Sequence, residues 1–294
     1  MRVLIVGATG YIGRHVAAHL HGRGHAVVGV SRRRAAAFER YAGYGWIAGD
    51  LHRDLEPDAW RRRLYAFDAV VNCAGIARET SDASFETVHA LGPSALYRAC
   101  EGIGVRRVLH VTPDGDPAAS RSPALATRHY AERKLESLDL DWVVLAHEEG
   151  VPVEKLCEGV AEALEGAEVR RRLTLRAPRT LLLYDGACPI CSSEMRRLAG
   201  LDRRKRLDFV DIAVPGFDAA RYGTTREAMM GRMHALAPDG ALLVGMDAIR
   251  AAYHAVGLGW LLSPTRWPLV RRLADRGYLA FARNRYAISR RLGL

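Results

Sequence analysis

The chain has 294 residues, of which 49% are hydrophobic, and carries a formal net charge of +10. Because single domains usually hold about 100 to 200 residues, this length predicts two cores. The arginines are scattered along the chain, and no zinc-finger, helix-turn-helix or aromatic-rich RNA signature accompanies them, which argues against nucleic acid as a partner. No signal-peptide pattern follows Met1, and no apolar run reaches the ~18–20 residues of a spanning helix. We therefore expect a soluble, cytoplasmic chain.

The first half of the chain alternates short apolar runs with amphipathic stretches. The expected strands are residues 3–6, 26–30, 69–72, 107–111 and 142–145, and the expected helices are 11–23, 84–103 and 128–137. Alternating strands and helices predict an α/β domain with a doubly wound parallel sheet of the Rossmann type. We place this domain at residues 1–147.

A glycine pattern, Gly7-Ala-Thr-Gly10-Tyr-Ile-Gly13, follows the first strand and opens the first helix. In that setting Gly7 permits a tight turn, Gly10 lets the backbone approach a pyrophosphate, and the helix N-terminus attracts negative charge. The alternative is a plain strand-turn-helix loop. The predicted cofactor contacts in this segment are Gly7, Thr9, Gly10, Tyr11, Ile12 and Gly13.

The second strand ends at Ser31 and Arg32, where an NAD enzyme would carry an acidic residue for the ribose 2′-hydroxyl. A guanidinium binds a 2′-phosphate in bidentate fashion, so this pair favours NADP(H) over NAD(H). The alternative is that the arginines merely coat a surface loop.

Together with Asp50-Leu51 and the turn Asn72-Cys-Ala74-Gly75, the glycine pattern resembles the short-chain dehydrogenase/reductase family, especially its extended and atypical branch. The resemblance covers about residues 1–147. It implies that Asp50, beside Leu51, contacts the adenine. It also implies that the turn containing Asn72, Ala74 and Gly75 lies alongside the cofactor.

Tyr130 and Lys134 have the Tyr-x-x-x-Lys spacing, which puts both side chains on one helical face and lets the lysine charge make the phenol a usable general acid. The family resemblance implies that Thr112 completes a triad with them. Pro113-Asp114-Gly115 replaces the usual serine-rich loop, and the substrate-binding subdomain expected after Leu145 is missing. A truncated domain that binds NADP(H) as a sensor or scaffold is therefore an alternative to a reductase.

Residues 148–178 are expected to form a linker, with a helix over 153–172 and no strand, before a second domain at 179–294. The second half gives strands at 181–184, 207–212, 233–237 and 241–244, with helices at 188–199, 225–230 and 246–256. This element order is that of a thioredoxin-like α/β domain, followed here by a helical tail.

The segment Asp185-Gly-Ala-Cys188-Pro189-Ile-Cys191 places two cysteines three residues apart at the start of a helix, directly after a strand. The helix N-terminus stabilises a thiolate, so we expect Cys188 to attack and Cys191 to resolve the mixed disulfide. A zinc site needs a second ligand pair, which the sequence lacks, and no metal is expected. The other cysteines, Cys73, Cys100 and Cys157, are expected to be free thiols.

The motif Asp185, Cys188 and Cys191, together with Asp211, His234, Asp239-Gly240 and Arg285-Tyr286, resembles the DCC family of thiol-disulfide oxidoreductases over residues 181–291. The resemblance implies an enzyme that acts on a disulfide-containing protein or small molecule. Asp185 is a candidate to relay protons or to cap the loop.

Three functions follow from these patterns. The leading one is a thiol-disulfide oxidoreductase fused to an NADP(H)-binding domain, the second a carbonyl reductase or epimerase with a regulatory dithiol, and the third a non-catalytic NADP-sensing or assembly protein. No flavin site is recognisable, so direct electron flow from NADPH to the dithiol is not predicted. The basic tail, with aromatic residues such as Trp260 and Trp267, would suit peripheral membrane contact, but packing on the redox domain is the favoured interpretation.

Overall fold

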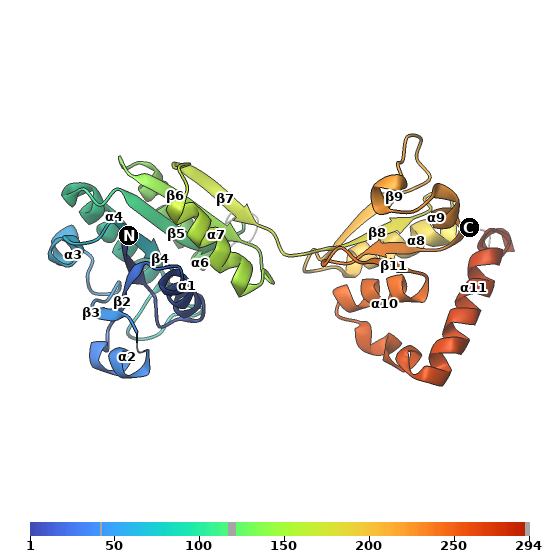
Figure 1. Cartoon of the computed structure of the whole chain (residues 1–294), viewed down its shortest axis with the longest axis horizontal. Helices are drawn as coiled ribbons and strands as arrows, with labels where there is room; N and C mark the ends of the chain where they lie inside the picture. Colours follow the sequence, from blue (N-terminus) through green and yellow to red (C-terminus); the bar gives the residue numbers. More distant parts are fainter. Residues whose placement is uncertain (42, 117–121, 292–294) are drawn as a thin grey trace. The chain divides into compact units, whose positions relative to one another are not determined.

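The computed structural model describes residues 1–41, 43–116 and 122–291. The chain divides into two compact units, Met1–Ala177 and Pro178–Leu294 (Figure 1). Both are α/β units, which confirms the predicted fold class. Residues 292–294 of the predicted second domain lie outside the described residues.

The first unit contains a parallel sheet with the strand order β3-β2-β1-β4-β5-β6-β7. Its strands are β1 (Arg2–Val6), β2 (Ala26–Ser31), β3 (Gly45–Ala48), β4 (Ala69–Asn72), β5 (Arg107–Pro113), β6 (Asp141–His147) and β7 (Arg171–Leu175). Because helices cover both faces of the sheet, its central strands are mostly apolar and nearly all of their residues are buried.

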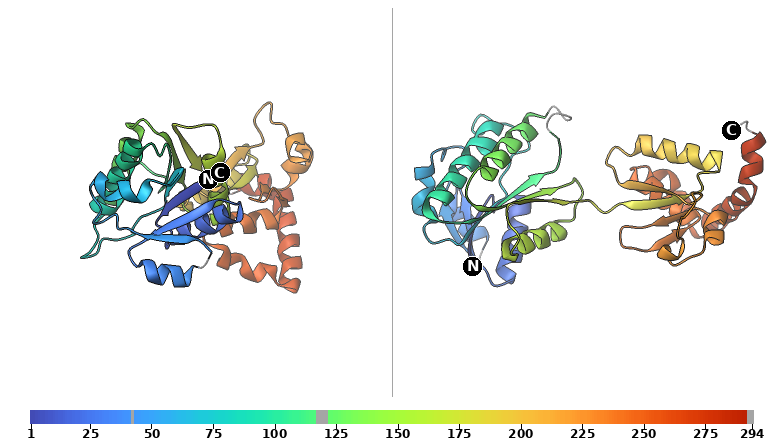
Figure 2. Two further views of the ribbon diagram at one scale, coloured as in Figure 1. Left: turned by 60° about the vertical axis from the view of Figure 1, so that its left-hand side comes forward. Right: turned by 90° about the horizontal axis from the view of Figure 1, so that it is seen from above.

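Helices cover the two faces of this sheet (Figure 2). They are α1 (Tyr11–Gly22), α2 (Arg34–Arg40), α3 (Pro57–Leu64), the π-helix η1 (Glu86–Leu91), α4 (Gly92–Ile103), α6 (Pro123–Glu136) and α7 (Val153–Glu165). One core cluster joins the sheet to α1, α2 and α7. The other joins it to α3, α4 and α6.

The predicted strandless linker 148–178 is wrong. Its helix, α7, ends at Glu165 and packs into the core of the first unit, and the strand β7 then pairs with β6 in parallel. In β7 only Leu173 and Leu175 pack on the core, because an edge strand alternates between a covered and a polar face. The arginines that flank the two leucines, Arg171, Arg172 and Arg176, hid the strand, and the sheet has more strands than the truncated one expected.

The second unit contains a four-stranded sheet with the order β11-β10-β8-β9, in which β8 and β9 are parallel and β10 is antiparallel to β8 and β11. Its strands are β8 (Thr180–Tyr184), β9 (Leu207–Asp211), β10 (His234–Leu236) and β11 (Leu242–Val244). Helices α8 (Pro189–Leu201) and α10 (Met246–Ala255) share one core cluster, and α9 (Arg226–Gly231) contributes to the other. A short 3-10 turn, η2 (Ala220–Tyr222), precedes α9.

The tail consists of the 3-10 segment η3 (Gly259–Arg266) and the long helix α11 (Pro268–Arg291), which contacts α8, α10 and η3. Within the part of the chain that the structure describes, none of the helices combines the length and apolar character that crossing a bilayer requires.

Candidate functional site

The glycine loop after β1 has the geometry that only glycine allows. Gly7 has a φ of +80°, and its carbonyl accepts a hydrogen bond of 2.9 Å from the Gly10 amide. A Cβ at Gly13 would lie 2.2 Å from that same carbonyl oxygen. The loop therefore delivers the N-terminus of α1, with Gly10 at its N-cap, to the carboxyl edge of the sheet, where an anion would bind.

Nine of the predicted cofactor residues line one cavity of about 200 Å³ at this edge. They are Gly7, Thr9, Gly10, Ser31, Arg32, Asp50, Leu51, Ala74 and Gly75. Tyr11, Ile12 and Gly13 lie outside its lining, on α1.

Asn72 is also outside this lining because its side chain is fully buried and shapes the turn beneath the cavity. Its amide donates to the Tyr97 hydroxyl at 2.9 Å, and its Oδ1 accepts from the Ala74 amide at 3.0 Å. Asn72 therefore holds the backbone at Ala74, which contacts the cavity, instead of contacting it directly.

A second, more open cavity of about 940 Å³ shares Thr9, Ser31, Arg32 and Asp50 with the first. Its further lining includes Arg33, Arg40, Arg53 and Arg63. Asp54 pairs with Arg63 at 2.6 Å, so part of this positive charge is already compensated. The remaining guanidinium groups make this the anion-attracting end of the nucleotide site.

No hydrogen bond joins the side chains of the predicted triad, Thr112, Tyr130 and Lys134, among the described residues. Thr112 is fully buried on β5, and its hydroxyl has no hydrogen-bond partner among the described residues. Tyr130 is 47% exposed on α6. The inward face of α6 carries Arg128 and Glu132 instead, with Arg128 lying against Gly75. The Tyr-x-x-x-Lys spacing fixes a common face for two side chains but not which face turns inward, and here Tyr130 is exposed and Lys134 half-buried.

In the second unit, the structure brings Cys188 and Cys191 together at the N-terminus of α8. Cys188 is the N-cap residue, Pro189 begins the helix, and the two sulfurs are 2.9 Å apart. Cys188 is fully buried, whereas Cys191 is partly exposed and lines a cavity. The accessible sulfur is therefore not the one expected to attack first.

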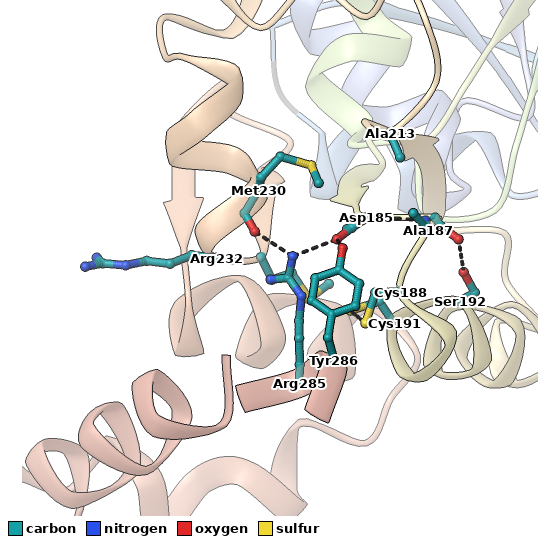
Figure 3. A network of polar contacts seen from close by, with 12 residues as sticks. Asp185, Ala187, Cys188, Cys191, Ser192, Ala213, Met230, Arg232, Arg285 and Tyr286 are labelled. Atoms are coloured by element: carbon teal, nitrogen blue, oxygen red, sulfur yellow. Dashed lines mark hydrogen bonds and ion pairs between the residues drawn. The ribbon is translucent and has the colours of Figure 1, made fainter. Parts of the chain in front are cut away.

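Asp185 lies just before the dithiol, at the end of β8, and is only 4% exposed. Its Oδ2 accepts hydrogen bonds from Arg285 Nη2 at 2.6 Å and from the Tyr286 hydroxyl, and its Oδ1 accepts from the Ala187 amide at 3.1 Å (Figure 3). Arg285 also donates to the Met230 carbonyl at 2.6 Å. Asp185 is therefore the buried partner of a cation from α11.

The loop between Asp185 and Cys188 is held from a neighbouring strand. Asp211 Oδ1 accepts from the amides of Gly186 and Ala213, both at 2.8 Å, and a Cβ at Gly186 would lie 1.9 Å from Asp211 Oδ2. The hydroxyl of Ser192 donates to the Gly186 carbonyl at 2.9 Å. These contacts fix the loop that carries the cysteines. Asp211 therefore has a structural role beside the site.

Burial decides the protonation of the cysteines and of a nearby histidine. Burial, and next the hydrogen bond to Cys188, raise the pKa of the Cys191 thiol, while Arg285 opposes the rise. Burial lowers the pKa of His234, which is 3% exposed and hydrogen-bonded to the Arg232 carbonyl, so this histidine is a neutral core residue. In the first unit, burial raises the pKa values of Cys73 and Cys100, which keeps them as unreactive thiols.

The aromatic and aliphatic residues of the tail divide into two groups. Leu262, Tyr278 and Phe281 line the cavity beside Cys191. Trp260 and Trp267 remain 68% and 65% exposed. Packing on the redox domain therefore accounts for only part of the apolar tail.

Sequence reasoning missed the roles of several residues. From the sequence alone, Arg285 and Tyr286 were recognised only as a motif and Tyr278 was given no role, although all three face the site. The 100 residues that separate Asp185 from Arg285 leave no local signal of their pairing. A buried acidic residue beside a dithiol was the available clue, because such a charge needs a cation.

Comparison with known families assigns both units. Residues 3–147 match the model of the NAD dependent epimerase/dehydratase family, and residues 182–291 match that of the DCC1-like thiol-disulfide oxidoreductases. The chain joins these two domain types. The epimerase-type unit thus has the fold of nicotinamide-cofactor domains, and both matched families are of the oxidoreductase type.

Individual relatives match one unit each. An uncharacterized chloroplastic protein of Arabidopsis thaliana is 33% identical over 114 residues, which cover 37% of this chain and 52% of that protein. The photosystem II assembly factor Ycf39 of Synechocystis is 29% identical over 146 residues, covering 49% of this chain and 44% of the relative. The chain thus spans about half the length of these curated relatives.

Among solved structures, the oxidoreductase ylbE of Lactococcus lactis superposes with a TM-score of 0.50 and 17% identity, covering 59% of this chain and 90% of the other. At this identity the likeness supports the fold of the first unit and nothing finer.

The ion pair between Asp185 and Arg285 gives a stability prediction. Arg285→Met leaves the carboxylate buried without its cation, so we expect the free energy of unfolding of the second unit to fall by about 3–5 kcal/mol. The double variant Asp185→Asn, Arg285→Met should recover part of that loss. Urea denaturation measures both, with the exposed Arg283→Met on the same helix as the control. A loss equal to that of the control would contradict the account.

Proposed function

We propose that the DCC1-like unit is a thiol-disulfide oxidoreductase in which Cys188 and Cys191 alternate between a dithiol and a disulfide. The observation that carries the proposal is the 2.9 Å separation of the two sulfurs at the N-terminus of α8. At that distance a small rotation of either side chain makes the bond. The buried Asp185–Arg285 pair holds the surrounding loop in place, which supports a preorganised pair.

The exposure of the two sulfurs gives the order in which they react. This order is the reverse of the one expected from the sequence motif, in which Cys188 attacks first. An incoming disulfide meets Cys191, because Cys188 is fully buried and Cys191 lines the cavity. Cys191 sulfur then forms the mixed disulfide and releases one substrate thiolate. Cys188, at the helix N-terminus, attacks Cys191 Sγ, so that the protein disulfide forms and the second substrate thiolate leaves.

For the epimerase-type unit, we propose binding of NADP(H) without proton transfer to a carbonyl substrate. The clustered guanidinium groups near Ser31 support a 2′-phosphate. The outward Tyr130 and the buried Thr112 argue against a working triad. The similarity to a relative named as an assembly factor agrees with a non-catalytic, nucleotide-binding part for this unit.

The order of the steps predicts where a mixed disulfide accumulates. With diphenyl disulfide as the substrate, Cys188→Ser should retain one phenylthio group on Cys191, since no thiol is left to displace it. In Cys191→Ser, labelling of Cys188 should be at least about tenfold slower because that sulfur is buried. Intact-mass measurement and peptide mapping read both outcomes, with the double serine variant as the blank. Labelling of Cys188 that is faster than labelling of Cys191 would contradict this order and support attack by Cys188 first.

The cofactor proposal predicts a selective loss of affinity. Arg32→Ala removes a bidentate phosphate contact, so the Kd for NADPH should rise about tenfold or more while the Kd for NADH changes little. Titration of nicotinamide fluorescence measures both constants. Arg34→Ala, which removes an arginine outside the cavity lining, is the matched control. Tighter binding of NADH than NADPH by the unaltered chain would refute the proposal.

A further inference from the structure

Cys191 opens onto a cavity of about 310 Å³ inside the second unit, between α8, α10 and the tail. Its volume falls at the lower end of the range for small-molecule sites, roughly 300–1,000 Å³. Most of its wall is apolar, and the larger side chains include Ile190, Met195, Met229, Met233, Ile249 and Phe281. Cys188 does not line it.

One polar group on the cavity wall, the Tyr278 hydroxyl, has hydrogen-bonding capacity to spare. Arg285 also lines the cavity and brings its positive charge to the wall, although its Nε, unpartnered among the described residues, is itself closed to solvent. The Tyr278 hydroxyl accepts from the Met233 amide at 2.7 Å, and no described residue accepts its own proton. Burial raises the pKa of Tyr278, so the phenol keeps that proton. A buried donor without a partner is costly, which indicates that a ligand oxygen completes the pairing.

The apolar wall and the Tyr278 donor limit the chemical class of ligand that this cavity can bind. An extended peptide would bring unpaired backbone groups into an apolar space, and an anionic disulfide would lose its hydration there. A compact apolar ring with carbonyl oxygens would fill the space and accept from the Tyr278 hydroxyl, with the Arg285 charge nearby. We propose that the cavity binds a quinone, and that the Cys188–Cys191 dithiol reduces it to the hydroquinone.

The reaction balances without a further reactant, and it rests on the dithiol function proposed above. Cys191 sulfur adds to the quinone, forming an S–C bond. Cys188 then attacks Cys191 Sγ, so that the S–S bond forms, the S–C bond breaks and its electron pair passes to the ring. The two thiols lose two protons and two electrons in all, and the quinone gains both. Tyr278 and Arg285 are placed to stabilise the negative charge that develops on the ring oxygens.

The test uses duroquinone (tetramethyl-p-benzoquinone), whose fully substituted ring resists lasting attachment to thiols. The intact chain is reduced, freed of reductant and mixed with duroquinone, and the loss of quinone absorbance is followed. Ala282→Phe fills the cavity from α11, whereas Ala280→Phe adds the same ring at an exposed position two residues away. Bis(2-hydroxyethyl) disulfide, an uncharged disulfide used in excess, serves in parallel as an oxidant whose reaction reports the dithiol function alone.

We expect a saturable rate that yields one hydroquinone and one Cys188–Cys191 disulfide per chain. Ala282→Phe should raise the half-saturating duroquinone concentration about tenfold or more, and Ala280→Phe should not change it. A rate that does not saturate, or equal half-saturating concentrations in the two phenylalanine variants, would overturn the quinone site. The dithiol function would stand in that case if bis(2-hydroxyethyl) disulfide still oxidised the chains. Failure of bis(2-hydroxyethyl) disulfide to oxidise any of the chains would overturn both.

Discussion

The second unit depends on one buried interaction, the ion pair between the Asp185 carboxylate and the Arg285 guanidinium. Asp185 stands at the end of β8, where the chain turns toward the dithiol, and is almost fully removed from water. A carboxylate in that position is costly without a cation, and Arg285 supplies one at 2.6 Å from a helix 100 residues later. Two apolar residues of similar volume would stabilise a core at least as well. What the charged pair adds is a defined position for α11 against the dithiol.

That position of α11 explains how the site is built. Tyr278, Phe281, Ala282 and Arg285 follow the three- and four-residue spacing of one helical face, and all of them line the cavity. The same face thus supplies the partner of Asp185 and one wall of the space in front of Cys191. Without α11, the dithiol of a thioredoxin-like core would be open to contact with the surface of a protein substrate. With α11 in place, the Cys191 sulfur instead faces the small apolar cavity. A cavity of this size favours a small molecule as the reaction partner of the two cysteines.

Features encoded within a few residues could be predicted from the sequence, and features set by distant contacts could not. The glycine loop around Gly7 and the approach of the two cysteines follow from spacing within one strand-loop-helix segment. The strand β7 was missed because an edge strand shows only half of its residues to the core. The inward face of α6 depends on how the whole helix packs, so the Tyr130 pattern could not reveal that it points outward. The cavity in front of Cys191 depends on α11, far along the chain.

The central claim is that Cys188 and Cys191 form a reversible disulfide while the remaining cysteines stay reduced. Equilibration of the intact chain in mixtures of 2-mercaptoethanol and its uncharged disulfide at graded potential, followed by acid quenching, alkylation and peptide mapping, tests it most directly. The account predicts a single two-electron transition confined to the peptide that contains Cys188 and Cys191, with Cys73, Cys100 and Cys157 alkylated throughout. Oxidation spread over those three cysteines, or no bridged peptide at any potential, would contradict it.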